Sequence, residues 1–175
     1  MNFLKNILDI CLLRGRAQDL PAAVGWVWLT AIASVMVNSL GIPSENMDVL
    51  HVLFIASQVA LFGAVVALLL HLRSFPSRWM QTMTALYAVD TVFSLLLLPL
   101  LPALVEMLKQ GAEVKPGWEG FALFFLSGWM LLIIARVFRE ATEWPLPLAF
   151  LVGLTSLLAV RMMGLLLVPL FGLKA

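Results

Sequence analysis

The 175-residue sequence is poor in charge and in cysteine, and each shortage excludes a class of protein. Only 12% of its residues are charged, whereas a soluble globular domain carries about a quarter. So few charged residues cannot cover a surface that faces water, and lipid is therefore the expected outer solvent. The single cysteine, Cys11, excludes an internal disulfide and a cysteine-based zinc cluster. No basic tail or aromatic-basic motif indicates a nucleic-acid partner.

Catalytic and metal-binding motifs are also missing. The sequence has no His-Glu-x-x-His zinc motif, no Gly-x-Ser-x-Gly nucleophile turn and no glycine-rich phosphate loop. The two histidines, His51 and His71, lie at opposite ends of one apolar segment, about 30 Å apart at helical rise, so they cannot share a metal. They fit polar positions at a membrane surface better. We therefore expect no enzyme and no cofactor.

Five long apolar segments dominate the chain. Each is long enough to cross a hydrocarbon core of about 30 Å, which takes about 20 helical residues. The expected spans cover approximately residues 22–40, 49–72, 79–104, 120–138 and 146–171. The third span contains Pro99 and Pro102, and it could instead end at Pro99, with residues 100–108 as a short interfacial helix. The predicted fold class is an all-α polytopic membrane bundle, with five transmembrane helices in residues 21–175.

Residues 1–20 predict an amphipathic helix at the membrane surface. Asp9 interrupts the apolar run and Arg14 and Arg16 follow it, which argues against a cleavable signal. Gly15 is the expected end of the helix. A frayed leader without a membrane role is the alternative. The apolar residues that recur at helical spacing are Leu4, Ile7, Leu8, Cys11 and Leu12.

The basic residues predict the orientation. An N-terminus in the cytoplasm places seven of them on the cytoplasmic side and three, Lys109, Lys115 and Lys174, outside. Positive charge gathers on cytoplasmic loops, so we expect the C-terminus outside, in a bacterial inner membrane. The seven residues would face anionic lipid or a partner, at about 1 kcal/mol each, or they only set the topology. They are Lys5, Arg14, Arg16, Arg73, Arg78, Arg136 and Arg139.

Asp90 and Arg161 are the two charged residues deep inside predicted spans, where ionisable groups are candidates for function. The two spans run in the same direction, and the residues differ in depth by roughly 7 Å. We expect an interhelical ion pair supported by Tyr87, Thr91 or Thr155. The pair could be structural glue only, or Arg161 could reach outward while neighbouring groups keep Asp90 neutral.

Small residues four apart on the second span predict close helix packing, either inside the bundle or between chains. The amides Asn38 and Gln58 are expected to form hydrogen bonds between helices. The small residues are Ala56, Ala60 and Ala64, together with Gly63 and Ala67.

Three stretches of the chain resemble the Yip (Ypt-interacting protein) family of five-span membrane proteins. The resemblance implies a non-enzymatic membrane organiser, adaptor or assembly factor, and it supplies no catalytic residue. The stretches are Leu12-Leu13-Arg14 through Asp19-Leu20-Pro21, Gln81 to Leu98, and Trp129 through Arg139-Glu140-Ala141-Thr142 with the apolar span that follows.

We therefore expect a protein that works by interaction, as a scaffold, adaptor or accessory subunit of a larger membrane complex. Its partners would be the lipid bilayer and either another membrane protein or further copies of the chain. The rival function is a small transporter or channel component with Asp90 and Arg161 in its path. The rival predicts a polar cavity that reaches these two residues, whereas the scaffold predicts a dry core and an exposed apolar seam.

Overall fold

A computed structural model describes residues 2–41, 48–102, 104–105 and 117–168, and this part of the chain is all-α. The 3-10 turns η1 (Ala17–Asp19), η3 (Pro76–Arg78) and η4 (Leu98–Leu100) lie beside the helices. The α-helices are α1 (Phe3–Cys11), α2 (Val24–Leu40), α3 (Val49–Leu72), α4 (Trp79–Leu97), α6 (Trp118–Thr142) and α7 (Leu146–Leu167).

Four helical segments are long and apolar enough to cross a membrane. They are Val49–Leu72, Pro76–Leu100, Trp118–Thr142 and Leu146–Leu167. The helix Val24–Leu40 is apolar but shorter. By length and composition, the structure therefore indicates a membrane-embedded helical protein. The prediction of five spans, rather than four, depends on whether the shorter helix α2 also crosses the membrane.

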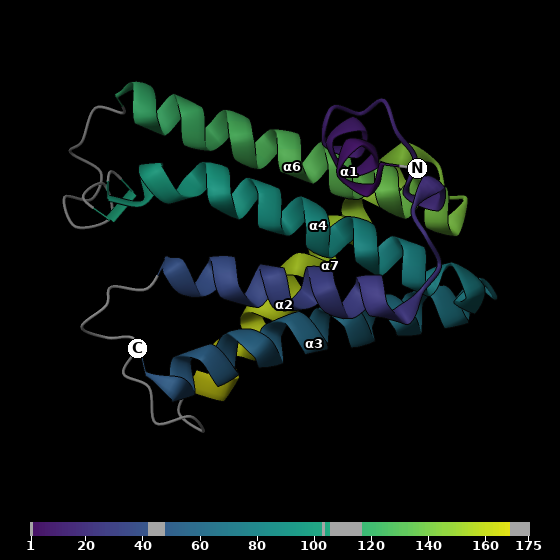
Figure 1. Cartoon of the computed structure of the whole chain (residues 1–175), viewed down its shortest axis with the longest axis horizontal. Coiled ribbons are helices and arrows are strands. Elements are labelled where there is room, and N and C mark those ends of the chain that lie inside the picture. Colours follow the sequence, from purple (N-terminus) through teal and green to yellow (C-terminus); the bar gives the residue numbers. More distant parts are fainter. Residues whose placement is uncertain (1, 42–47, 103, 106–116, 169–175) are drawn as a thin grey trace.

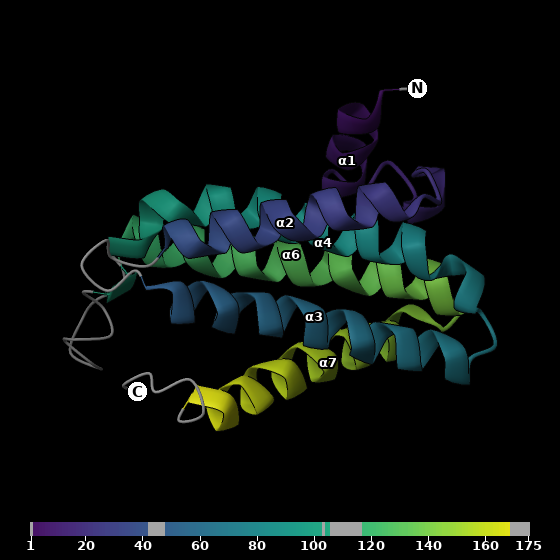
Figure 2. The ribbon, with the colours of Figure 1, turned by 60° about the horizontal axis from the view of Figure 1, so that its bottom comes forward.

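The long helices form a closed ring, and α3 and α4 also contact each other across it. Going around the ring, α2 packs against α4, α4 against α6, α6 against α7, α7 against α3, and α3 against α2. Figure 1 shows that α2 and α4 run in the same direction, while the other neighbours are antiparallel. Helix α1 lies crosswise to the long helices and projects from the side of the bundle, nearer the end at which α4 begins, as Figure 2 shows.

Two predicted helix ends are wrong because residues in the left-handed region end these helices elsewhere. We expected the fourth span to end at residue 138, but α6 continues to Thr142, and Glu143 with φ of 61° ends it. We expected Gly15 to end the first helix, but α1 ends at Cys11, and Leu13 takes φ of 59°. Such backbone angles are uncommon outside glycine, so hydrophobic periodicity does not reveal them.

Local signals fix the other boundaries more closely. Helix α3 has the predicted bounds, and the Asp48 carboxylate accepts a hydrogen bond from the Val49 amide at its start (2.6 Å). Ser74, with φ of 62°, and Pro76 form the turn into α4. Helix α4 gives way to the 3-10 turn η4 around Pro99. Residues 101–102 and 104–105 are helical, whereas the rest of the alternative helix at residues 100–108 and the end of the last span beyond residue 168 lie outside the described residues.

Helix α4 lies at the centre of the packing. In the most apolar stretch of the segment Pro76–Leu100, which contains α4, 50% of the residues are buried, against 11% in that of α3. The α4 side chains Met83 and Val89 are fully buried together with Phe138 of α6. On the outside of the bundle, large apolar side chains such as Phe124 (83% exposed) and Leu166 (75% exposed) stand open. A surface of this kind suits lipid rather than water.

The small residues of α3 do not all face the same way. Gly63 is buried and lies so close to Tyr87 of α4 that an added Cβ would come within 2.6 Å of the tyrosine oxygen. Ala60 and Ala64 are instead exposed on the outer surface, and Ala56 and Ala67 are half-buried. Only part of the predicted packing stripe therefore contributes to the contact with Tyr87 inside the bundle.

We expect Gly63→Ala to destabilise the bundle by about 1–3 kcal/mol. The new methyl group would displace the Tyr87 hydroxyl, which donates a hydrogen bond to the Val59 carbonyl (2.7 Å). Gly128→Ala is the matched control, because nothing lies within 4 Å of its added Cβ, and alanine favours a helix by about 1 kcal/mol over glycine. Unfolding by SDS titration, followed by circular dichroism, measures both. Equal stability of the two variants would contradict the packing assigned to Gly63.

Candidate functional site: a cavity lined by the five long helices

The Asp90 carboxylate, near the middle of α4, is held by two side chains of α2. Its Oδ2 atom accepts hydrogen bonds from the Ser34 hydroxyl (2.6 Å) and from the Asn38 amide (2.9 Å). The side-chain oxygen Oδ1 of Asn38 accepts in turn from the Ser94 hydroxyl (3.3 Å). Residues four apart share a helix face, so two positions on each helix form one polar ladder between α2 and α4.

This ladder confirms the prediction that Asn38 bonds between helices, but Ser34 and Ser94 were missed. A usable signal is present in the sequence, since Ser34 and Asn38 are four apart on one apolar segment and Asp90 and Ser94 are four apart on another. Ser34 is 1% exposed, so its hydrogen bond to the carboxylate is shielded from solvent. Hydrogen bonds to a charged group contribute about 1.5–3 kcal/mol each.

A cavity of about 200 Å³ lies beside the ladder, and all five long helices line it. Its apolar walls include Phe62 of α3 and Leu157 of α7. Both hydrogen bonds to Asp90 end on Oδ2, so Oδ1 has no partner among the described residues. The polar lining consists of Ser34, Asn38, Gln58, Tyr87, Asp90 and Arg161.

Gln58 is the second unusual group in this cavity. Its side chain is 9% exposed, and neither its amide oxygen nor its amide nitrogen has a hydrogen-bond partner in the described part of the chain. The expected interhelical hydrogen bond of Gln58 is therefore not formed there. Gly164 of α7 makes room for the amide, because a Cβ at that position would lie 2.6 Å from Oε1. A buried amide without a partner costs about 1–3 kcal/mol and identifies a place where a polar molecule would be stabilised.

Arg161 lines the same cavity as Asp90, so the structure brings the two predicted residues to one site. The ion pairs within 4 Å among the described residues join Arg78 to Glu143 and Arg136 to Glu140. A direct pair between Asp90 and Arg161 is not one of them. It stays a prediction, while the carboxylate has neutral partners on α2.

The hydroxyl groups that we expected to support the ion pair bond to the backbone instead. Tyr87 donates to the Val59 carbonyl (2.7 Å), and Thr91 donates to the carbonyl of Tyr87 (2.8 Å). Thr155 donates to the Leu151 carbonyl (2.8 Å). Threonine commonly bonds one helical turn back in this way. Each of these three hydroxyls thus donates its hydrogen to a backbone carbonyl, and the expected support of the ion pair stays a prediction.

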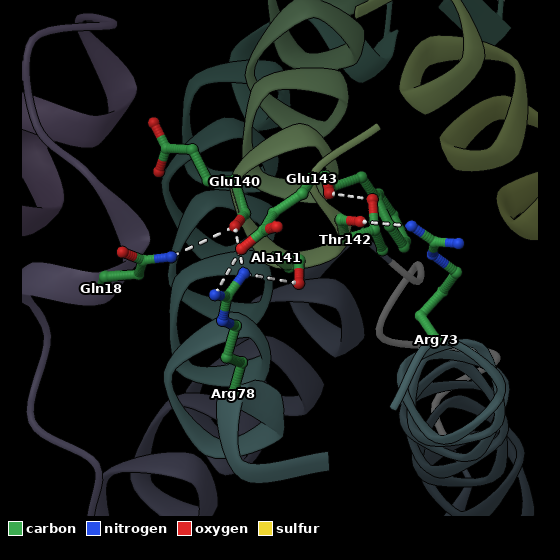
Figure 3. A network of polar contacts seen from close by, with 8 residues as sticks. Gln18, Arg73, Arg78, Glu140, Ala141, Thr142 and Glu143 are labelled. Atoms are coloured by element: carbon green, nitrogen blue, oxygen red, sulfur yellow. Dashed lines mark hydrogen bonds and ion pairs between the residues drawn. The ribbon is translucent and has the colours of Figure 1, made fainter. Parts of the chain in front are cut away.

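A second polar cluster lies at the α1 end of the bundle, around the end of α6 (Figure 3). The backbone oxygen of Glu140 accepts from Gln18 (3.1 Å) and Arg78 (3.2 Å), and Arg78 also bonds the Ala141 carbonyl (3.3 Å). Arg73 donates to the Thr142 carbonyl (3.4 Å). The last carbonyls of a helix lack partners within it and favour positive charge, so these arginines stabilise the end of α6.

The same cluster fixes the chain that leads into the bundle. The Glu140 carboxylate accepts from the Ala17 amide (3.1 Å) and from Arg136 Nε (3.2 Å). Arg136 also donates to the Leu13 carbonyl. Three of the seven predicted membrane-surface residues, Arg73, Arg78 and Arg136, therefore have structural contacts as well. Lys109, Lys115 and Lys174 lie outside the described residues.

Helix α1 packs on α4 and α6 with one apolar face and presents another outward. Ile7, Ile10 and Cys11 are buried, and the Trp129 indole donates to the Cys11 carbonyl (2.9 Å). Burial raises the pKa of the Cys11 thiol to about 11, so the thiol stays protonated at neutral pH and is a poor nucleophile. Leu4 is 70% exposed, and it shares the outward face with Leu8 and Leu12.

Within the described ranges, no group of three or more His, Cys, Asp or Glu side chains could hold a metal ion. His51 and His71 lie near opposite ends of α3. In comparisons with protein families, curated proteins and solved structures, no family model, protein or structure matched the chain. The resemblance to the Yip family therefore stays a prediction.

We expect the polar ladder to show energetic coupling in double-mutant cycles. Asp90→Ala and Asn38→Ala should be non-additive by about 0.5–3 kcal/mol, since each removes the other's partner. The cycle of Asp90→Ala with Arg161→Ala tests the predicted ion pair, and strictly additive effects would refute that pair. The free energy of unfolding in SDS is measured for all variants. An additive result for Asp90 and Asn38 would contradict the ladder itself.

Proposed function

We propose that this protein is a non-enzymatic membrane protein with five spans that passes a small polar solute through the cavity in its helical ring. It would act as a small transporter or as a component of a channel. The observation that carries the proposal is a cavity lined by all five long helices, to which the Asp90 carboxylate, the exposed Arg161 and the Gln58 amide, unpartnered among the described residues, contribute. Polar and ionisable groups among apolar membrane helices are costly in free energy, so they are candidates for a functional role.

The position of α2 in the bundle supports the proposal that this helix also crosses the membrane, which brings the number of spans to five. It lies beside α4 and runs parallel to it, and its side chains Ser34 and Asn38 bond Asp90 at the middle of the bundle. Seventeen helical residues extend about 25 Å, only slightly less than a hydrocarbon core. The basic residues of α1, η3 and the end of α6 lie at one end of the bundle. This distribution supports a cytoplasmic N-terminus and an outer C-terminus, in a bacterial inner membrane.

The cavity limits the size and chemistry of the solute. Its volume of about 200 Å³ lies below the roughly 300–1,000 Å³ typical of sites for drug-sized ligands. The carboxylate of Asp90 accepts hydrogen bonds, the guanidinium of Arg161 donates them, and the amide of Gln58 does both. A small neutral or zwitterionic solute that carries both donors and acceptors would satisfy these groups.

Uptake into liposomes tests this function. The purified protein is reconstituted, and swelling in glycerol, urea or glycine is followed by stopped-flow light scattering. We expect at least one solute to enter faster than into protein-free liposomes, and Asp90→Asn to return that rate to the protein-free value. This change removes the charge at nearly constant size and leaves an acceptor for Ser34.

Thr91→Val is the matched control, because Thr91 lies next to Asp90 on α4 and, within the described part of the chain, its hydroxyl bonds to the backbone of its own helix. It should keep the uptake rate. Circular dichroism and gel filtration establish that both variants are folded. Uptake that is unchanged in Asp90→Asn, or no uptake of any of the three solutes with the unmodified protein, would refute the proposal.

A scaffold or accessory subunit is the second candidate function, and the outward position of Ala60 and Ala64 on α3 supports it. Small residues four apart let another membrane helix approach closely. A Yip-like adaptor would use such a surface to bind a membrane protein or another copy of the chain. We expect a pull-down in mild detergent to recover a near-stoichiometric partner, and Ala60→Phe to lose it. Gly128→Phe on the outer surface of α6 is the control, and recovery of the chain alone as a monomer would contradict this function.

A further inference from the structure

A second, open pocket of about 580 Å³ lies at the α1 end of the bundle, where η1, η3, the end of α6 and the start of α7 meet. Part of its wall is the cluster in Figure 3. Its lining is rich in arginine, and the charged residues that line it are Arg16, Arg78, Arg136, Arg139, Glu140 and Glu143.

The charges of this pocket do not cancel. Glu143 is paired with Arg78 (2.6 Å), and Glu140 is paired with Arg136 (3.2 Å). Two arginines, Arg16 and Arg139, are then left without an acidic partner among the described residues, and both are exposed. Four arginines and two glutamates leave a net charge of +2 in the pocket.

One side of the pocket is apolar. Leu132 of α6 (45% exposed) and Leu146 at the start of α7 (42% exposed) contribute to its lining. Both side chains belong to helices that are apolar and long enough to span a membrane. The charged part of the pocket lies where α6 ends and α7 begins, near the chain from Arg139 to Leu146. Helix α1 lies crosswise near the same end of the bundle. The pocket thus joins a basic surface at the ends of these helices to the apolar surfaces along them.

We propose that this pocket binds the phosphate group of an anionic phospholipid, with the acyl chains against the apolar surfaces of α6 and α7. The planar guanidinium group matches a phosphate through paired hydrogen bonds, and Arg16 and Arg139 have donors free for it. Arg78 and Arg136 are positioning residues, because their hydrogen bonds to Glu143, Glu140 and nearby carbonyls fix the wall. Basic pockets between membrane helices are a known way of binding anionic headgroups.

Native mass spectrometry of the purified protein in detergent tests this site. The protein is mixed with equal amounts of phosphatidylglycerol and phosphatidylcholine, and the bound lipid is counted. We expect one retained phosphatidylglycerol in preference to phosphatidylcholine. Arg16→Gln and Arg139→Gln should each weaken its retention about fivefold, and the double variant about 30-fold. Neither side chain has a structural partner among the described residues, so circular dichroism should show both variants folded.

Arg14→Gln is the matched control, because Arg14 is exposed at the same end of the bundle but does not line the pocket. It should retain phosphatidylglycerol as the unmodified protein does. An equal loss in Arg14→Gln would show diffuse attraction to the basic end and overturn the site. Displacement of the lipid by an equal concentration of glycerol 1-phosphate would show that a soluble phosphate binds as well, and would overturn the lipid as its ligand.

Discussion

The structure depends on the need to stabilise one carboxylate among apolar helices. Asp90 lies near the middle of α4, and its hydrogen bonds come from Ser34 and Asn38 on the neighbouring helix α2. An ionised group without partners in such surroundings costs several kcal/mol. The contact therefore ties α2, which is shorter than the other long helices, to α4. Because α2 also packs on α3, the same contact closes the ring around the cavity.

The same logic holds at the α1 end, where the groups that need partners are backbone carbonyls. Arg73 and Arg78 bond the last carbonyls of α6, and the Glu140 carboxylate bonds the Ala17 amide. Lipid is as apolar as leucine, so apolar contact alone does not specify which membrane helices associate. The polar contacts supply that specificity, and they hold the lead-in chain and α1 against the end of the bundle.

The sequence predicted what local signals determine and missed what packing determines. The observed bounds of α3 agree with the predicted ones because Asp48 precedes the apolar run and a turn follows it. The end of α6 was missed because it depends on the backbone angle of Glu143. Asp90 was identified because a charged group in lipid costs free energy. Its hydrogen bond from Ser34 could not be predicted, because that bond depends on the parallel packing of α2 against α4, which apolar periodicity does not define. Gln58 shows the same limit, since the position of its amide against Gly164, where it has no partner among the described residues, depends on helix packing.

Helix α6 separates the two candidate sites. Met130 and Ile134 line the cavity inside the ring, whereas Leu132 and Arg136 line the pocket at the α1 end. Residues two apart point roughly 200° apart around a helix, so one helix presents a largely apolar wall to the cavity and an amphipathic wall to the pocket. The two sites consequently differ in charge and in depth. The cavity is lined by one carboxylate, Asp90, and one guanidinium, Arg161, whose charges offset each other, and the pocket has excess positive charge where the apolar helices end. This separation lets the cavity and the pocket bind molecules of different chemistry without sharing a side chain.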